Sequence, residues 1–178
     1  MARPGVHMRR MQFKQWIPVD VEQVFLFFAD PRNLPRIMPP ASGTNLIETR
    51  LVPPLNYISQ SGTVENIAGV GSEIVTSFRL LPCFPFRAKW IARITEFEWN
   101  YRFIDKQVKG PFKHFQHRHE FAAMDRGAMR GTSIRDVIEY QVGYALLGAI
   151  ADKLWIEPTL KRTFSWRQRA VKEIFGPF

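Results

Sequence analysis

The stretch YRFIDKQVKGPFKHFQHRHEFAAM, residues 101–124, decides the fold class of this 178-residue chain. It contains two runs in which polar and apolar residues alternate, joined by Gly110 and Pro111. Alternation with a period of two is typical of a half-buried β-strand, and a Gly-Pro pair between two such runs indicates a hairpin turn. The stretch therefore predicts two antiparallel neighbouring strands, at residues 101–109 and 112–124.

Strand-like runs continue on both sides of this hairpin. The further strands are predicted at residues 11–17, 44–51, 72–81, 86–97 and 132–142. From residue 44 onward these strands are separated by turns and loops rather than by helices. Residues 52–71 are rich in Pro and Gly and are expected to form a long mobile loop. Strands joined in this way form an antiparallel sheet.

Helical patterns lie near the two ends of the chain. Asp20 is a candidate N-cap, followed at helical spacing by apolar residues that begin with Val21 and Val24. A second short helix is predicted at residues 31–37, and a loop at 38–43. A long helix is predicted at residues 144–175, where Leu154 is among the residues of the apolar face and Pro158 should kink or restart the helix.

The element order predicts an α+β protein: a seven-stranded curved antiparallel sheet around a long C-terminal helix, with two short helices after the first strand. A strongly curved sheet cannot touch a helix everywhere, so a largely apolar cavity is expected between them. Residues 1–10 are read as a disordered lead-in and residues 11–178 as one domain. Cys83, the only cysteine, excludes an intramolecular disulfide. No signal peptide or membrane-spanning run is seen, and the expected location is the cytoplasm.

The strand at residues 112–124 predicts the character of the cavity wall. His114, Gln116, Arg118 and Glu120 share one polar face, which belongs in water. The opposite face then points into the cavity. Tyr101, Phe103, Asp105 and Gln107 share one face of the neighbouring strand, and alternate residues from Thr132 to Tyr140 share one face of the strand after it. The predicted ligand cavity is lined by Phe103, Asp105, Gln107, Phe115, His117, His119, Phe121, Asp136 and Tyr140. Hairpin lengths decide whether Asp105 and Asp136 share a side with the histidines, and the sequence leaves this open.

Two interpretations of the polar cluster stay open. A carboxylate beside His117 or His119 could set its tautomer and make it a general base, so these two are the candidate catalytic residues, although no catalytic role is assigned. Alternatively the cluster satisfies itself as a buried hydrogen-bonded network. A metal site is not predicted, because two imidazoles are too few ligands and no further His or Cys pair completes the set. No cofactor is expected, and Cys83 is expected to be a small packed side chain.

The net charge of +9 is scattered except near the C-terminus. The basic residues there are Lys153, Lys161, Arg162, Arg167, Arg169 and Lys172, interleaved with Trp155, Phe164 and Trp166. One interpretation is the solvated back of a core helix. The other is a surface that associates weakly with anionic membrane or RNA. Specific DNA binding is not expected.

The chain also resembles a known superfamily over about residues 11–175. The resemblance rests on QWIP at 15–18, VFLFFADPRNL at 24–34, FIDKQVKGPF at 103–112, HRHEF at 117–121, GT at 131–132 and DVIEY at 136–140. These are similar to the helix-grip superfamily of START domains and birch-pollen-allergen-like proteins, and most similar to its bacterial polyketide cyclase/dehydrase and coenzyme-Q-binding types. The resemblance implies a helix-grip fold that binds a lipid, an isoprenoid or a polyketide-like compound. The resemblance allows two alternative functions: a cyclase or dehydratase that acts on a polyketide-like substrate, and a ribosome- or membrane-associated interaction module.

Overall fold

A single antiparallel sheet organises the protein, whose computed structural model describes residues 8–55, 66–79, 86–143 and 151–176. Its strands are β1 (Arg9–Ile17), β2 (Asn45–Arg50), β3 (Glu73–Arg79), β4 (Arg87–Glu98), β5 (Arg102–Lys109), β6 (His114–Ala123) and β7 (Thr132–Gln141). Across the sheet the order is β1-β7-β6-β5-β4-β3-β2, so β2 to β7 form a meander and β1 returns beside β7. The predicted α+β architecture is confirmed.

The first strand begins slightly earlier than the sequence predicts. Arg9 and Arg10 already pair with Tyr140 and Glu139 of β7, so the predicted lead-in overlaps β1 at these two positions. The rest of that lead-in, residues 1–7, lies outside the described residues.

Short helices follow β1 as predicted. The Asp20 side chain accepts a hydrogen bond from the backbone N–H of Glu22 at 2.8 Å, which caps helix α1 (Val21–Ala29). The 3-10 helix η1 (Pro31–Asn33) and helix α2 (Leu34–Ile37) complete the pair. The predicted loop at residues 38–43 contains one further 3-10 turn, η2 (Pro40–Ser42), where a proline occupies the first turn and supplies a helical φ.

The described part of the C-terminal helix starts with a π-helical segment. This segment, η3 (Asp152–Ile156), leads directly into helix α4 (Glu157–Phe175), and Pro158 lies in the first turn of α4. The chain changes from π to α geometry just before Pro158 without a break between the two helices, and the predicted kink or restart stays a prediction. The inward position expected of Leu154 is wrong, because its exposed fraction is 61% and the wider π turn displaces the helical phase. Leu147 lies outside the described residues.

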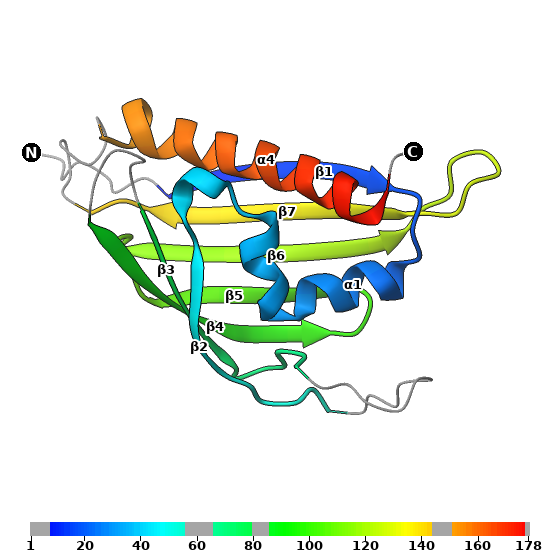
Figure 1. Ribbon diagram of the computed structural model, residues 1–178, viewed down its shortest axis with the longest axis horizontal. Coiled ribbons are helices and arrows are strands. Elements are labelled where there is room, and N and C mark those ends of the chain that lie inside the picture. The colour runs from blue at the N-terminus through cyan, green and yellow to red at the C-terminus, as the bar shows by residue number, and fades with distance from the viewer. Residues whose placement is uncertain (1–7, 56–65, 80–85, 144–150, 177–178) are drawn as a thin grey trace, which may run out of the picture.

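The helices cover one face of the sheet. Figure 1 shows α4 along the β1/β7 edge, with α1 in front of β5 and β6 on the same side. The core divides into two clusters: one surrounds Phe25, whose ring touches Phe97, Phe103 and Phe121, and the other joins Phe115 and Tyr140 to Phe164. None of the helices in the described residues is both long and apolar enough to span a membrane.

Close backbone packing fixes the described part of the segment between β2 and β3. The N–H of Gly69 donates to Val52 O at 2.9 Å, and a Cβ at Gly69 would lie 2.7 Å from that oxygen, so only glycine fits. Residues 56–65 of the predicted mobile loop lie outside the described residues, and so do residues 80–85, which include Cys83.

Candidate functional site

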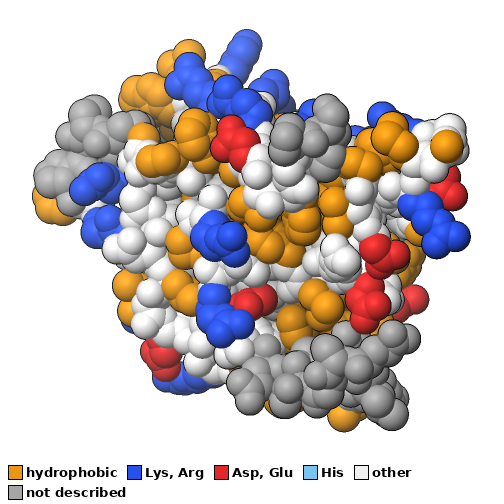
Figure 2. Space-filling view, turned by 45° about the vertical axis from the view of Figure 1, so that its right-hand side comes forward, with side chains coloured by type: hydrophobic (Ala, Val, Ile, Leu, Met, Phe, Trp, Pro, Cys, Tyr) orange, Lys and Arg blue, Asp and Glu red, His pale blue; other side chains and the backbone are white. Residues whose placement is uncertain are grey.

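A cavity of about 460 Å³ lies between the sheet and the helices. Its wall is formed by side chains from β3 to β6, from α1 and α2, and from η3 and α4. Most of them are apolar, including Phe27, Phe28, Ile37, Ile74, Phe78, Trp90, Ile94, Phe103, Phe112, Phe115, Trp155, Ile156, Leu160 and Phe164. In Figure 2 apolar side chains gather near the centre of one face, with charged side chains around them. The volume suits a small organic molecule.

One sector of this wall is polar, and strand register creates it. On β6, His117 lies opposite Asp105 of β5, and His119 lies opposite Asp136 of β7. His117 Nε2 forms a hydrogen bond with Asp136 Oδ1 at 2.9 Å. His119 Nδ1 lies 2.9 Å from the same oxygen, although this contact lacks hydrogen-bond alignment. The question that the sequence left open is therefore answered: both carboxylates share the inner side with the histidines.

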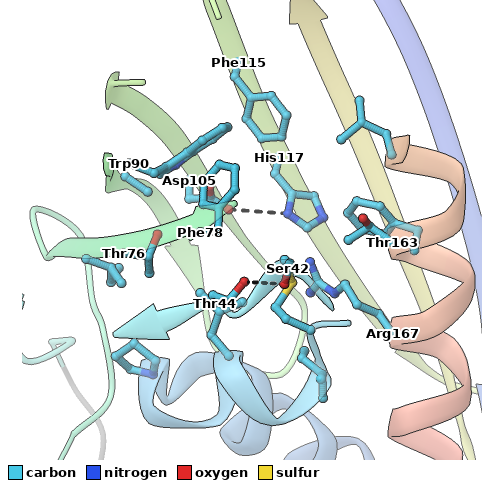
Figure 3. A pocket seen from close by; sticks show the side chains of 18 of the residues that line it. Ser42, Thr44, Thr76, Phe78, Trp90, Asp105, Phe115, His117, Thr163 and Arg167 are labelled. Atoms are coloured by element: carbon cyan, nitrogen blue, oxygen red, sulfur yellow. Dashed lines mark hydrogen bonds and ion pairs between the residues drawn. The ribbon is translucent and has the colours of Figure 1, made fainter. Parts of the chain in front are cut away.

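The other nitrogen of each ring faces Asp105. Asp105 Oδ2 lies 3.6 Å from His117 Nδ1 and 3.7 Å from His119 Nε2, too far for hydrogen bonds. Figure 3 shows Asp105 and His117 directed at the same space, with Arg167 entering it from α4. The cluster is therefore connected tightly through Asp136 and loosely through Asp105.

Burial governs the protonation of this sector. Burial lowers the pKa of His117 to about 4 and lowers that of His119 as well, so both rings are neutral near pH 7. Burial raises the pKa of Asp105. Burial alone would also raise the pKa of Asp136, but the hydrogen bond from His117 and the contact with His119 hold it well below its usual range. Asp136 is thus ionised near pH 7.

Aromatic side chains hold the two imidazoles in place. Phe103 stacks on His119, with ring centres 4.3 Å apart, and Phe164 meets His117 edge-on at 5.2 Å. The two imidazoles are therefore packed against aromatic rings from β5 and α4, and all four side chains line the cavity.

The structure separates the nine predicted cavity residues into two groups. Phe103, Asp105, Phe115, His117 and His119 line the cavity. The other four are outside its lining: Asp136 is buried behind the histidines, Phe121 packs on Phe25, Tyr140 donates its hydroxyl to Asp152 Oδ1 at 2.7 Å, and Gln107 donates to Phe112 O at 2.7 Å.

Residues at the two ends of β5 do not line the cavity, because the pairing with β6 ends before them. The described pairing of β5 with β6 spans Arg102 to Lys106, so Gln107 lies beyond it and its amide holds the hairpin turn. Tyr101, which was predicted to share a face with Phe103, precedes β5 and is exposed. The polar face of β6 is only half-buried rather than fully solvated, and Glu120 accepts from Arg135 Nη1 at 2.9 Å.

Arg167 is a charged cavity residue that was predicted to lie on the surface. It was grouped with the basic surface, but its exposed fraction is 7% and its side chain lines the cavity. Its guanidinium lies over the Phe164 ring at 4.7 Å, its Nε has no hydrogen-bond partner, and it forms no ion pair with another described residue. Its spacing could have revealed it, because Phe164, Arg167 and Val171 follow the i, i+3, i+7 rule of one helix face.

Three of the polar residues form a set with metal-ligand character. Asp105, His117 and His119 each offer one ligand atom, and these atoms lie within 4.8 Å of one another. The sequence-based reasoning counted only histidines and cysteines, so a carboxylate from the neighbouring strand was left out of the count.

Most of the chain matches the model of a known protein family. Residues 17–167 match the model of the family described as polyketide cyclase / dehydrase and lipid transport. The chain belongs to this family. The resemblance seen in the sequence is thereby confirmed, and family membership supports hydrophobic-ligand binding or cyclase-like chemistry in general terms. No curated protein matches the chain significantly.

Solved structures share the fold at low sequence identity. The Ms6760 protein from Mycobacterium smegmatis is 15% identical with a TM-score of 0.60, covering 93% of this chain and 90% of that one. The Zhui aromatase/cyclase from Streptomyces sp. R1128 is 15% identical with a TM-score of 0.60, covering 93% and 92%. Norcoclaurine synthase from Thalictrum flavum is 12% identical with a TM-score of 0.61, covering 98% and 100%. At these identities the likeness shows the fold alone.

Proposed function

We propose that this protein binds a hydrophobic small molecule, with an apolar body and one polar end, in the cavity between the sheet and α4. The observation that carries this proposal is the cavity of about 460 Å³, whose wall is mostly apolar and includes a cluster of ionisable side chains around His117 and Arg167. Burying each methylene of a ligand contributes about 0.8 kcal/mol, so the aromatic wall provides affinity without a catalytic group. A lipid, an isoprenoid and a polyketide-like compound all meet this description.

The polar sector sets the orientation of the ligand. Arg167 offers unpaired donors, while His117 Nδ1 and Asp105 Oδ2 offer acceptors on the facing wall. A buried polar group without a partner is costly, so a ligand that satisfies these atoms is favoured over a pure hydrocarbon. The polar end should therefore lie between Arg167 and the histidines, with the apolar body against Trp90 and Phe78.

A cavity-filling substitution tests this proposal. Ala92 of β4 lines the cavity, so Ala92→Phe should fill the space and weaken binding of the neutral fluorescent probe N-phenyl-1-naphthylamine at least tenfold, about 1.4 kcal/mol. Ala122→Phe, at an exposed position of β6, is the matched control and should bind normally. Native mass spectrometry of protein purified without added ligand provides the second measurement. A wild-type protein that binds no probe and retains no small molecule would refute the proposal.

A cyclase or dehydratase activity is the second candidate. The observation in its favour is the hydrogen bond between His117 and Asp136, which leaves His117 Nδ1 facing the cavity, where it could accept a proton from a substrate. Replacement of His117 or His119 by Gln should abolish turnover of a polyketide-like substrate and leave its affinity nearly unchanged. Loss of folding in both variants would instead assign the histidines to the buried network.

A further inference from the structure

We propose that Asp105, His117 and His119 form a binding site for a divalent transition-metal ion of the Zn²⁺ class, open to the cavity on one side. The three residues come from two adjacent strands, and strand register fixes them together: His117 lies directly opposite Asp105, and His119 follows on the same face of β6. The site is therefore held by rigid elements, as a metal site requires.

Three acceptor atoms converge with no donor between them. Asp105 Oδ2 lies 3.6 Å from His117 Nδ1 and 3.7 Å from His119 Nε2. Among the described residues no side chain donates a hydrogen bond to any of these three atoms. All three atoms lie within 4.8 Å of one another. With Zn–N and Zn–O bonds of about 2.0–2.1 Å, neighbouring ligand atoms of a tetrahedral site lie roughly 3.3 Å apart, so side-chain rotations must bring these atoms closer by up to about 1.5 Å.

Asp136 supplies the outer support that metal-binding histidines need. A ligating imidazole usually contacts a carboxylate with the nitrogen that does not bind the metal, which fixes the ring and its tautomer. Here one oxygen, Asp136 Oδ1, lies 2.9 Å from His117 Nε2 and 2.9 Å from His119 Nδ1. One carboxylate thus turns the free nitrogens of both rings toward Asp105.

A divalent cation fits the charges of this cluster. A metal ion bound here would displace any proton from Asp105, so Asp105 and Asp136 would contribute −2 and Arg167 +1, which leaves −1 for the ion to offset. Arg167 forms no ion pair with either carboxylate in the described residues, so its guanidinium does not fill the position between Asp105 and the imidazoles. A divalent ion there brings the sum to +1, and an anionic fourth ligand in front of Arg167 would bring it to zero.

The ligand set selects the class of ion. Two imidazoles and one carboxylate suit Zn²⁺, Co²⁺ or Fe²⁺, whereas Mg²⁺ and Ca²⁺ prefer oxygen ligands alone. Three protein ligands leave at least one coordination position, and the cavity is the space that this position faces. An oxygen atom on a bound molecule could therefore coordinate the ion directly, which would add a specific contact to the apolar binding proposed above.

Metal titration tests the site. With Zn²⁺ alone as the probe, isothermal titration calorimetry of the wild-type protein should show one saturable site per chain, and Co²⁺ should give the visible absorption of a tetrahedral site. Asp136→Asn should weaken binding about 10–100-fold, as expected for an outer-sphere carboxylate. Asp105→Asn and His119→Gln should weaken it further, because they remove ligands. His114→Gln, on the opposite face of β6, is the matched control and should bind like the wild type.

An NMR measurement on the wild-type protein tests the site even if the substituted proteins do not fold. Proton–nitrogen NMR of the histidine rings should show that Zn²⁺ shifts His117 Nδ1 and His119 Nε2 and leaves His114 unchanged. The proposal is overturned if Zn²⁺ does not saturate at one per chain, if the His114→Gln control loses the binding, or if neither buried ring responds. Probe binding in the presence of a chelator separates the two proposals, because the hydrophobic cavity does not need the metal.

Discussion

The guanidinium of Arg167 lies 4.7 Å from the centre of the Phe164 ring, inside the cavity and one helical turn further along α4. Burial lowers the pKa of Arg167, with the charges of Asp136 and Asp105 opposing this shift, so the folded state disfavours its charge. An arginine held in this way costs stability, and the cost points to a role in binding.

Replacing this arginine should therefore stabilise the protein. Arg167→Met keeps the length of the side chain and removes the buried charge, so the free energy of unfolding should rise by about 1 kcal/mol in urea denaturation. Arg169→Met, at an exposed position of the same helix, is the control and should stay within about 0.5 kcal/mol of the wild type. A clear loss of stability in Arg167→Met would mean that the carboxylates stabilise the guanidinium more than burial destabilises it.

The two buried histidines predict acid sensitivity of the metal-free protein. The pKa of His117 falls from its ordinary 6.5 to about 4 on folding, so between these values the unfolded chain binds a proton that the folded chain does not. Stability should then decrease as the pH falls from 6.5 to 4, by about 1.4 kcal/mol per pH unit for one such histidine. His119 shifts in the same direction and adds to the slope, whereas the raised pKa of Asp105 opposes it.

The lowered pKa of Asp136 adds to the slope only at the acid end of this window, because its contribution begins to be lost about one pH unit above the ordinary value of 3.8. Urea denaturation in the presence of a chelator, repeated across the pH range, measures the slope, and His117→Gln should reduce it. A stability that is flat from pH 6.5 to 4 would contradict the buried neutral state of both rings.

A hydrogen-bonded link between β7 and η3 should be measurable in the same way. Tyr140 donates its hydroxyl to Asp152 Oδ1 at 2.7 Å, and Arg9 Nε donates to Oδ2 at 2.9 Å. Tyr140→Phe leaves a buried carboxylate oxygen without a donor and should cost about 1–3 kcal/mol of unfolding free energy. Tyr101→Phe, at an exposed phenol, should change it by less than about 0.5 kcal/mol. Equal effects of the two substitutions would contradict the link.

The exposed basic residues of α4 remain a separate prediction. Without the buried Arg167, the exposed set is Lys161, Arg162, Arg169 and Lys172. We expect weak, salt-sensitive cosedimentation with phosphatidylserine vesicles and none with phosphatidylcholine, since each cation near an anionic surface contributes about 1 kcal/mol. Changing Lys161, Arg162 and Arg169 to Glu should abolish it, whereas Lys89→Glu on β4 should not. Binding that survives the triple change would exclude this surface.

The sequence predicts the strands well because alternation and turn residues are local signals. The hairpin between β5 and β6 follows directly from Gly110 and Pro111, and its register brings Asp105 opposite His117. How deeply an inward-pointing side chain is buried depends on other elements that pack over it, and the local sequence does not show this. Phe121 points inward as predicted, and so does Asp136, whose side the sequence left open. Each is nevertheless covered by a side chain from another element, Phe25 and His119 respectively.

On the C-terminal helix the error runs in the other direction, because Arg167 was predicted at the surface and is buried. Composition grouped Arg167 with its basic neighbours, and only the periodicity of the helix distinguishes it from Arg169. The π turn at η3 carries no strong sequence signal, so the exposure of Leu154 could not be foreseen from spacing that assumed a regular helix.

The pairing of β1 with β7 has a consequence for synthesis on the ribosome. Arg9 pairs with Tyr140, so the first strand to leave the exit tunnel has no partner until most of the chain has been made. The apolar side chains of β1, among them Met11 and Phe13, need protection during that interval, and contacts of such long sequence separation form slowly. Helix α4 emerges later still. The inner face of the sheet is therefore the last part of the core to be covered, and its aromatic side chains stay in contact with solvent until α4 packs on them (Figure 1).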